Sequence, residues 1–199
     1  MSARLVQLVF AALTGAVLTA TTIRPDPPSP VLTAADIGFA QDMSAHHQQA
    51  VTMSDMLTSD AGPDVRALAD QIRTTQLVEI GQLTGWLQLV DAPPSAPAPM
   101  AWMHEGADHP MAAGMPGIAS PAELVRLQHS SGPANATLYL QLMIRHHQGG
   151  IDMAAHAVRE TPTDAVRRIA ATMLDEQTQE TQVMTVLLEQ RGHVALPYP

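Results

Sequence analysis

Apolar residues recur at the spacing of a helix face in two long stretches that lie about one hundred residues apart. In each stretch they step by four and three residues, which is the period of one side of an α-helix. Proline- and glycine-containing breaks separate the periodic runs. The pattern predicts four long helices, over about 34–59, 64–90, 135–160 and 164–191, and a short one over 121–129.

Two of these expected helices begin with a capping box, in which a hydroxyl residue is followed three positions later by an acid. Thr33 precedes Asp36, and Ser120 precedes Glu123 with Pro121 at the first helical position. Such a pair satisfies backbone N–H groups that the first turn of a helix leaves without partners. Both positions are therefore predicted helix starts.

The sequence also repeats itself. The run from Phe39 to Gln48 is matched by the run from Tyr139 to Gln148, and each run contains a His-His-Gln triplet. Each copy is one helix–turn–helix unit with a single apolar seam, so the two units are expected to bury their seams against each other. The predicted fold is all-α: an antiparallel four-helix bundle built from two repeated helical hairpins.

Proline-rich stretches divide the chain. We expect residues 1–23 to be a signal peptide or an N-terminal membrane anchor, because one arginine precedes a short apolar run. The protein is then secreted or held in the cell envelope. The other expected segments are a Pro-rich linker (24–33), the bundle (34–191, with repeats 36–90 and 135–191 and a Met/His-rich connection 91–120) and a tail (192–199).

The amino-acid composition excludes some classes of partner and of metal ligand. The formal net charge is −9, all basic residues are arginine, and only 3% of residues are aromatic. A basic patch or an aromatic platform is therefore missing from the sequence, and nucleic acid is not an expected partner. The chain has no cysteine, which rules out disulfides and thiolate metal ligands.

Polar residues interrupt both apolar seams at matching positions. Methionine thioethers and imidazoles are ligands for soft and borderline metals, and together they favour copper, as Cu(I) or Cu(II). The predicted ligands in the bundle are Met43, His46, His47, Met53, Met143, His146, His147 and Met153. The side chains expected to orient these imidazoles from the partner helices are Gln76, Glu79, Gln177 and Glu180. His156 is a further candidate for a peripheral site, near Asp152 and Met153.

The connection between the hairpins carries a second concentration of such residues, without helical or strand period. Its predicted copper ligands are Met103, His104, His109, Met111 and Met115. The other interpretation is that these methionines fill a groove on the bundle. For the bundle site, the ordinary imidazole pKa of about 6.5 predicts that copper binding weakens below about pH 6. Thioethers do not titrate in that range, so the connection is expected to keep Cu(I) at lower pH.

The residues from Met143 to Ala154, together with Gln177, Glu180 and Met184, resemble the bacterial family called domain of unknown function 305. The resemblance implies a ferritin-like helical fold, export, and a role of the His doublets in binding copper. The first copy departs from the pattern, because Gln49 and Ala50 stand where the second has Gly149 and Gly150.

Three functions stay open on the sequence. The favoured one is an exported protein that sequesters or transfers copper and is not an enzyme. The second is a metal-free envelope interaction module whose core contains a His/Gln/Glu polar layer. The third, a ferritin-like di-metal oxidase, is disfavoured: such sites use Glu-x-x-His, and Gln82 and Val183 follow the two glutamates instead.

Overall fold

The computed structural model describes residues 31–103 and 114–198. This part of the chain is helical and contains no strand. The elements are α2 (Ala34–Asp55), α3 (Pro63–Leu89), the 3-10 helix η1 (Ala101–Met103), α4 (Pro121–Gln128), α5 (Gly132–Glu160) and α6 (Asp164–Glu189). The predicted fold class is confirmed. The predicted leader, 1–23, lies outside the described residues.

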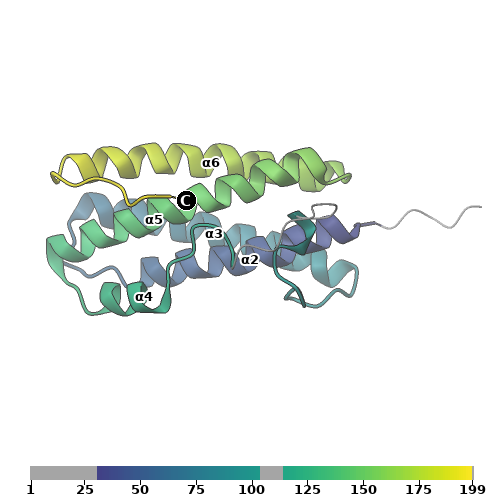
Figure 1. The fold of residues 1–199 in the computed structure, drawn as a ribbon, viewed down its shortest axis with the longest axis horizontal. Helices are drawn as coiled ribbons and strands as arrows, with labels where there is room; N and C mark the ends of the chain where they lie inside the picture. Colours follow the sequence, from purple (N-terminus) through teal and green to yellow (C-terminus); the bar gives the residue numbers. More distant parts are fainter. Residues whose placement is uncertain (1–30, 104–113, 199) are drawn as a thin grey trace, which may run out of the picture. The chain divides into compact units, whose positions relative to one another are not determined.

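The four long helices form two antiparallel hairpins, α2 with α3 and α5 with α6 (Figure 1). The hairpins meet mainly through α2 and α5. These two helices carry the His-His-Gln triplets, so the repeat in the sequence is brought to the centre of the contact between the hairpins.

The predicted caps are present. The Thr33 and Ser120 hydroxyls accept hydrogen bonds from the backbone N–H of Asp36 and Glu123, and each carboxylate bonds back to the N-cap residue. The helix ends differ from prediction in two places. α2 ends four residues early, and α5 begins three residues early because its first turn accepts Pro133.

The early end of α2 has a tertiary cause. The amide of Asn135, on α5, accepts from the backbone N–H of Thr58 at 2.9 Å and donates to the carbonyl of Met56 at 3.3 Å. These contacts supply partners for backbone groups that the end of a helix leaves unpaired. The same buried side chain on α5 of the second hairpin therefore ends α2 at the turn of the first hairpin.

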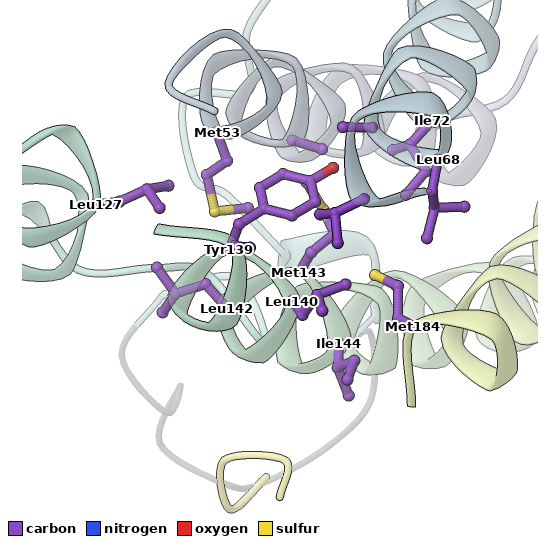
Figure 2. Close-up of a cluster of buried hydrophobic side chains, with 14 of the residues drawn as sticks. Met53, Leu68, Ile72, Leu127, Tyr139, Leu140, Leu142, Met143, Ile144 and Met184 are labelled. Atoms are coloured by element: carbon purple, nitrogen blue, oxygen red, sulfur yellow. The ribbon is translucent and has the colours of Figure 1, made fainter. Parts of the chain in front are cut away.

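The core consists of two apolar clusters, one on each side of a polar layer. The first, here the tyrosine cluster, is shown in Figure 2 and includes Met53, Leu68, Ile72, Tyr139, Met143 and Met184. The second, the tryptophan cluster, includes Phe39, Met43, Leu83, Trp102, Met153 and Met173. Full burial of one such side chain stabilises the fold by about 1.5–3 kcal/mol.

None of the helices in the described ranges is long and apolar enough to cross a membrane.

Candidate functional site

The polar layer between the two clusters holds eight side chains from four helices, all of them buried. We call it the histidine layer. The four imidazoles come from α2 and α5 and are fully inaccessible to solvent, and an amide and a carboxyl come from each of α3 and α6. Its members are His46, His47, Gln76, Glu79, His146, His147, Gln177 and Glu180.

His46 and His146 lie at the centre of this layer. Their ring centroids are 3.8 Å apart and the ring planes are inclined by 32°. Nε2 of His46 lies 3.2 Å from the carbonyl oxygen of Pro116, and Nε2 of His146 lies 3.1 Å from that of His46. Because a carbonyl only accepts, both Nε2 atoms carry the proton. Each neutral ring therefore keeps its lone pair on Nδ1.

The second histidine of each doublet faces a glutamate. Nε2 of His147 is hydrogen-bonded to Glu180 Oε2 at 2.8 Å. Nε2 of His47 lies equally close, 2.8 Å, to Glu79 Oε2, although at an angle outside the usual range for a hydrogen bond. A carboxylate in this position orients an imidazole.

All four Nδ1 atoms of these histidines are buried and have no hydrogen-bond partner among the described residues. The side-chain amides of Gln76 and Gln177 are in the same state. Buried polar atoms are nearly always paired, because a buried polar atom without a partner costs about 1–3 kcal/mol. The layer thus contains more binding capacity than the described protein atoms satisfy.

Burial favours the neutral form of three of the imidazoles. It lowers the pKa of His46 and His47 to about 3, and that of His146 well below its usual value, with neighbouring histidines adding to the effect. The expectation of protonation near pH 6 therefore does not hold for these three rings in the folded protein. Neutral imidazole is the form that binds a metal ion.

Two carboxyl groups, those of Glu79 and Glu176, meet beside the layer. Burial raises the pKa of Glu79 to about 7, and this carboxyl also shares a hydrogen bond with Glu176. The pKa of Glu176 is raised, first by burial and then by Glu79. Sequence reasoning missed Glu176. Its signal was its position, four residues before Glu180 and so on the same face of α6.

One segment, residues 114–120, crosses the layer on the α2 and α5 side, and we call it the crossing segment. Gln49 holds it by accepting from the N–H of Ala119 at 2.7 Å and donating to the Ala119 carbonyl at 2.9 Å. At the matching place in α5 the backbone of Pro116 lies so close that a Cβ on Gly149 would be 2.0 Å from its carbonyl oxygen.

This crossing explains the difference between the two copies of the repeat. The glutamine of the first copy holds the crossing segment, and the glycine of the second copy gives it room. Gly150 is equally constrained, because a Cβ there would lie 2.2 Å from Oε1 of Gln177. The two halves of the layer are therefore not equivalent.

The predicted methionine ligands divide between the two clusters. Met53 and Met143 belong to the tyrosine cluster, and Met43 and Met153 belong to the tryptophan cluster, all with no exposed surface. The layer lies between these two pairs. Every predicted bundle ligand is thus in or beside one part of the core.

Of the predicted ligands in the connection, Met103 and Met115 are half-buried and pack against the tryptophan cluster. His104, His109 and Met111 lie outside the described residues. Within the described ranges, no three His, Asp or Glu side chains converge closely enough to hold a metal ion. A site built from these residues would need methionine sulfur beside imidazole, or a small number of ligands.

Comparison with other proteins identifies the family. The model of the domain of unknown function DUF305 matches residues 36–188. A DUF305 protein from Streptomyces coelicolor, described as a candidate secreted protein, is 38% identical over 82% of this chain and 96% of that one, with a TM-score of 0.74. A DUF305 fragment from Deinococcus radiodurans is 29% identical over 81% of this chain and 99% of that one, with a TM-score of 0.68.

Solved structures with lower sequence identity are similar to this chain in fold alone. The structure of CopM in its Cu(II)-bound form is 24% identical, covers 78% of this chain and 96% of that one, and has a TM-score of 0.61. No curated protein matches this chain. The family match spans both hairpins and the histidine layer, and by this evidence the chain belongs to the DUF305 family.

Proposed function

We propose that this protein is an extracytoplasmic copper-binding protein that sequesters or transfers the ion without chemical turnover. The bundle site lies in the histidine layer, and Met and His residues of the connection form a further capture element. Copper is the cargo of this function and not a resident catalytic group.

The observation that carries the proposal is the state of His46 and His146. Each ring donates its Nε2 proton to a carbonyl, and each presents a buried Nδ1 lone pair with no partner among the described residues. The rings are neutral at pH 7 because burial lowers their pKa. A lone pair held in this way is prepared to bind a metal ion at low cost in proton release.

The surrounding residues favour copper over harder ions. Imidazole and thioether are the soft ligands available, while Mg²⁺ and Ca²⁺ prefer a shell of oxygen atoms. Glu79 and Glu180 lie behind His47 and His147, where a carboxylate increases the basicity of an imidazole ligand. CopM, which shares the fold, has been solved with Cu(I) and with Cu(II), in keeping with this choice.

Export follows from the same proposal. The apolar segment at residues 1–23 is the expected signal or anchor. The relative from Streptomyces coelicolor is described as a candidate secreted protein.

One alternative function has a specific observation behind it. The contacts of His47 with Glu79 and of His147 with Glu180 also suit a metal-free polar layer that fixes the register of the helices in an interaction module. The two functions differ in the fate of added copper, which a polar layer does not retain.

The test is a copper titration of the untagged protein, compared with the double variant His46→Leu/His146→Leu. A tag is omitted because polyhistidine binds copper. We expect the wild type to retain copper through gel filtration, and the double variant to lose at least one equivalent while keeping its helical circular dichroism. Equal copper in the two folded proteins would exclude the bundle site. Iron in place of copper in a metal analysis of the purified protein would favour the oxidase.

A further inference from the structure

A second set of soft ligands lies away from the histidine layer. A cavity of about 340 Å³ is lined by Ala35, Trp102, Met103, His156 and Glu160. His156 follows the His146–His147 doublet on α5 by about ten residues, which corresponds to roughly 15 Å along the helix. The cavity is therefore separate from the site proposed above.

The indole of Trp102 is fixed in place on several sides. Its Nε1 donates to Asp42 Oδ2 at 3.0 Å, and the same oxygen accepts from the backbone N–H of Met100 at 2.6 Å. The ring of Phe39 packs against it with a centroid distance of 5.5 Å. Gly38 leaves it room, because a Cβ at that position would lie 2.8 Å from the Trp102 side chain.

Because the Nε1 proton is already donated to Asp42, the indole can contribute only its ring system to the cavity that it lines. The His156 ring packs against the indole in a T-shaped arrangement, with centroids 5.3 Å apart and planes inclined by 71°. Met103 follows Trp102 in η1 and is half-buried, which puts a thioether beside the same cavity. Glu160 lies one helical turn after His156 and adds a carboxylate at the exposed side.

We propose that this cavity is a second copper site, specific for Cu(I), formed by the thioether of Met103 and the imidazole of His156 under the indole face of Trp102. It deepens the copper function proposed above and rests on it. Thioether sulfur favours Cu(I). An aromatic face attracts a cation, most strongly when that face is indole and water is excluded. Sequence reasoning placed Met103 and His156 in separate candidate sites, and the fold brings them to one cavity.

The experiment uses Trp102 as its own reporter. The chain has two tryptophans, so Trp86→Phe in the full-length protein leaves Trp102 as the single indole fluorophore. Cu(I) is titrated without oxygen against a competing chelator, while Trp102 emission and bound copper are both measured. The variants are Met103→Leu and His156→Gln, and the matched control is Met56→Leu, a half-buried methionine at the other end of α2.

We expect Trp102 emission to change and to saturate with one equivalent of Cu(I). The affinity read from this signal should fall at least tenfold in Met103→Leu and in His156→Gln, and stay unchanged in Met56→Leu. It should also persist in His46→Leu/His146→Leu, because the two sites are separate. Circular dichroism of each variant checks that the bundle is folded.

The outcomes separate the two proposals. Two results overturn the second site and leave the histidine layer as the copper site. One is that copper is retained while Trp102 emission does not change. The other is that the Met103 and His156 variants respond as strongly as the protein with both residues unchanged. Loss of the Trp102 response in the His46/His146 double variant also overturns the second site, since the reporter would then sense the layer. A chain that binds no copper at all overturns both.

Discussion

The imidazole rings of His46 and His146 lie one upon the other, 3.8 Å between centroids, although their positions in the chain are one hundred residues apart. The contact joins the two hairpins at the middle of the α2–α5 interface. It also buries two Nδ1 lone pairs without hydrogen-bond partners among the described residues. Buried polar atoms without partners lower the stability of the metal-free fold.

The first prediction follows from the free-energy cost of these two unpaired nitrogen atoms. In metal-free protein, the double variant His46→Leu/His146→Leu should be about 1 kcal/mol more stable than wild type, because two unpaired buried polar atoms are removed. Either single variant should be less stable than the double, because it leaves one unpaired Nδ1 beside an apolar side chain. Urea denaturation in the presence of a chelator measures this. A double variant destabilised by more than about 2 kcal/mol would indicate a structural polar layer instead.

The second prediction concerns the crossing segment. Gly149→Ala should destabilise the protein by about 1–3 kcal/mol, because the new Cβ would lie 2.0 Å from the carbonyl oxygen of Pro116 and backbone must move. Gly81→Ala is the matched control: it lies inside α3 with no atom near the added Cβ, and it should stabilise by about 0.5–1 kcal/mol. Thermal denaturation of the two variants should shift in opposite directions, and equal shifts would contradict the close approach.

The third prediction is a pH dependence of the metal-free protein. The pKa of His46 and of His47 is lowered from 6.5 to about 3, so unfolding takes up protons between these values and stability falls as the pH falls below 6.5. His146 acts in the same direction. Glu79 opposes them, because its pKa rises from 4.5 to about 7, so its contribution is lost as the pH rises through that range.

Glu176, whose pKa is also raised, acts in the same direction as Glu79, and the three histidines outweigh both glutamates. Near pH 5.5 unfolding should take up about one to two protons, which lowers the free energy of unfolding by roughly 1–3 kcal/mol for each pH unit. Melting temperatures at pH 7, 6 and 5 check this. The double variant His46→Leu/His146→Leu should show a clearly flatter dependence. A wild-type melting temperature that stays constant from pH 7 to 5 would show that the imidazoles are not held neutral.

The fourth prediction concerns the docking of α4 on α5. Arg145 binds Glu123 through two hydrogen bonds, 2.9 and 2.7 Å long, and this contact lowers the pKa of Glu123 to about 2. Glu123→Gln keeps the capping box and removes the charge, so it should cost up to about 1 kcal/mol at pH 7 for this partly exposed pair.

The direction of the Glu123 pKa shift determines the pH range in which this ion pair stabilises the fold. A lowered pKa means that the contribution of Glu123 is complete above pH 4.5 and is lost as the pH falls towards 2. The difference in unfolding free energy between wild type and Glu123→Gln should therefore shrink across that window. Asp55→Asn, which breaks the more exposed pair with Arg73, is the control and should change stability by less. A difference that is constant with pH would exclude the ion pair as its cause.

The sequence by itself determined the helices and the two starts that have capping boxes. The four-and-three spacing of Phe39, Met43 and His46 can bury one continuous stripe only on a helix. The capping residues Thr33 and Ser120 act on N–H groups three positions away, so local sequence contains all the information they need. The duplication then implied two similar hairpins, and the DUF305 resemblance followed from the second His-His-Gln triplet.

Only the tertiary structure decided which groups meet inside the histidine layer. A doublet places its two rings about 100° apart on a helix, and the local pattern does not show that the second ring faces the glutamate while the first stacks on its counterpart. The neutral state of the rings is likewise decided by burial, which no local pattern measures.

The local sequence also does not predict the contacts of the crossing segment, or those of the cavity lined by Trp102 and His156. Pro116 reaches Gly149, and Trp102 reaches His156, across loops whose path is set by packing on the finished bundle. The sequence marked Met103 and His156 as chemically notable but left them in different elements. Their meeting depends on how the connection folds back over α2 and α5, because contacts between residues far apart in the chain are fixed by the whole fold and not by the spacing of nearby residues.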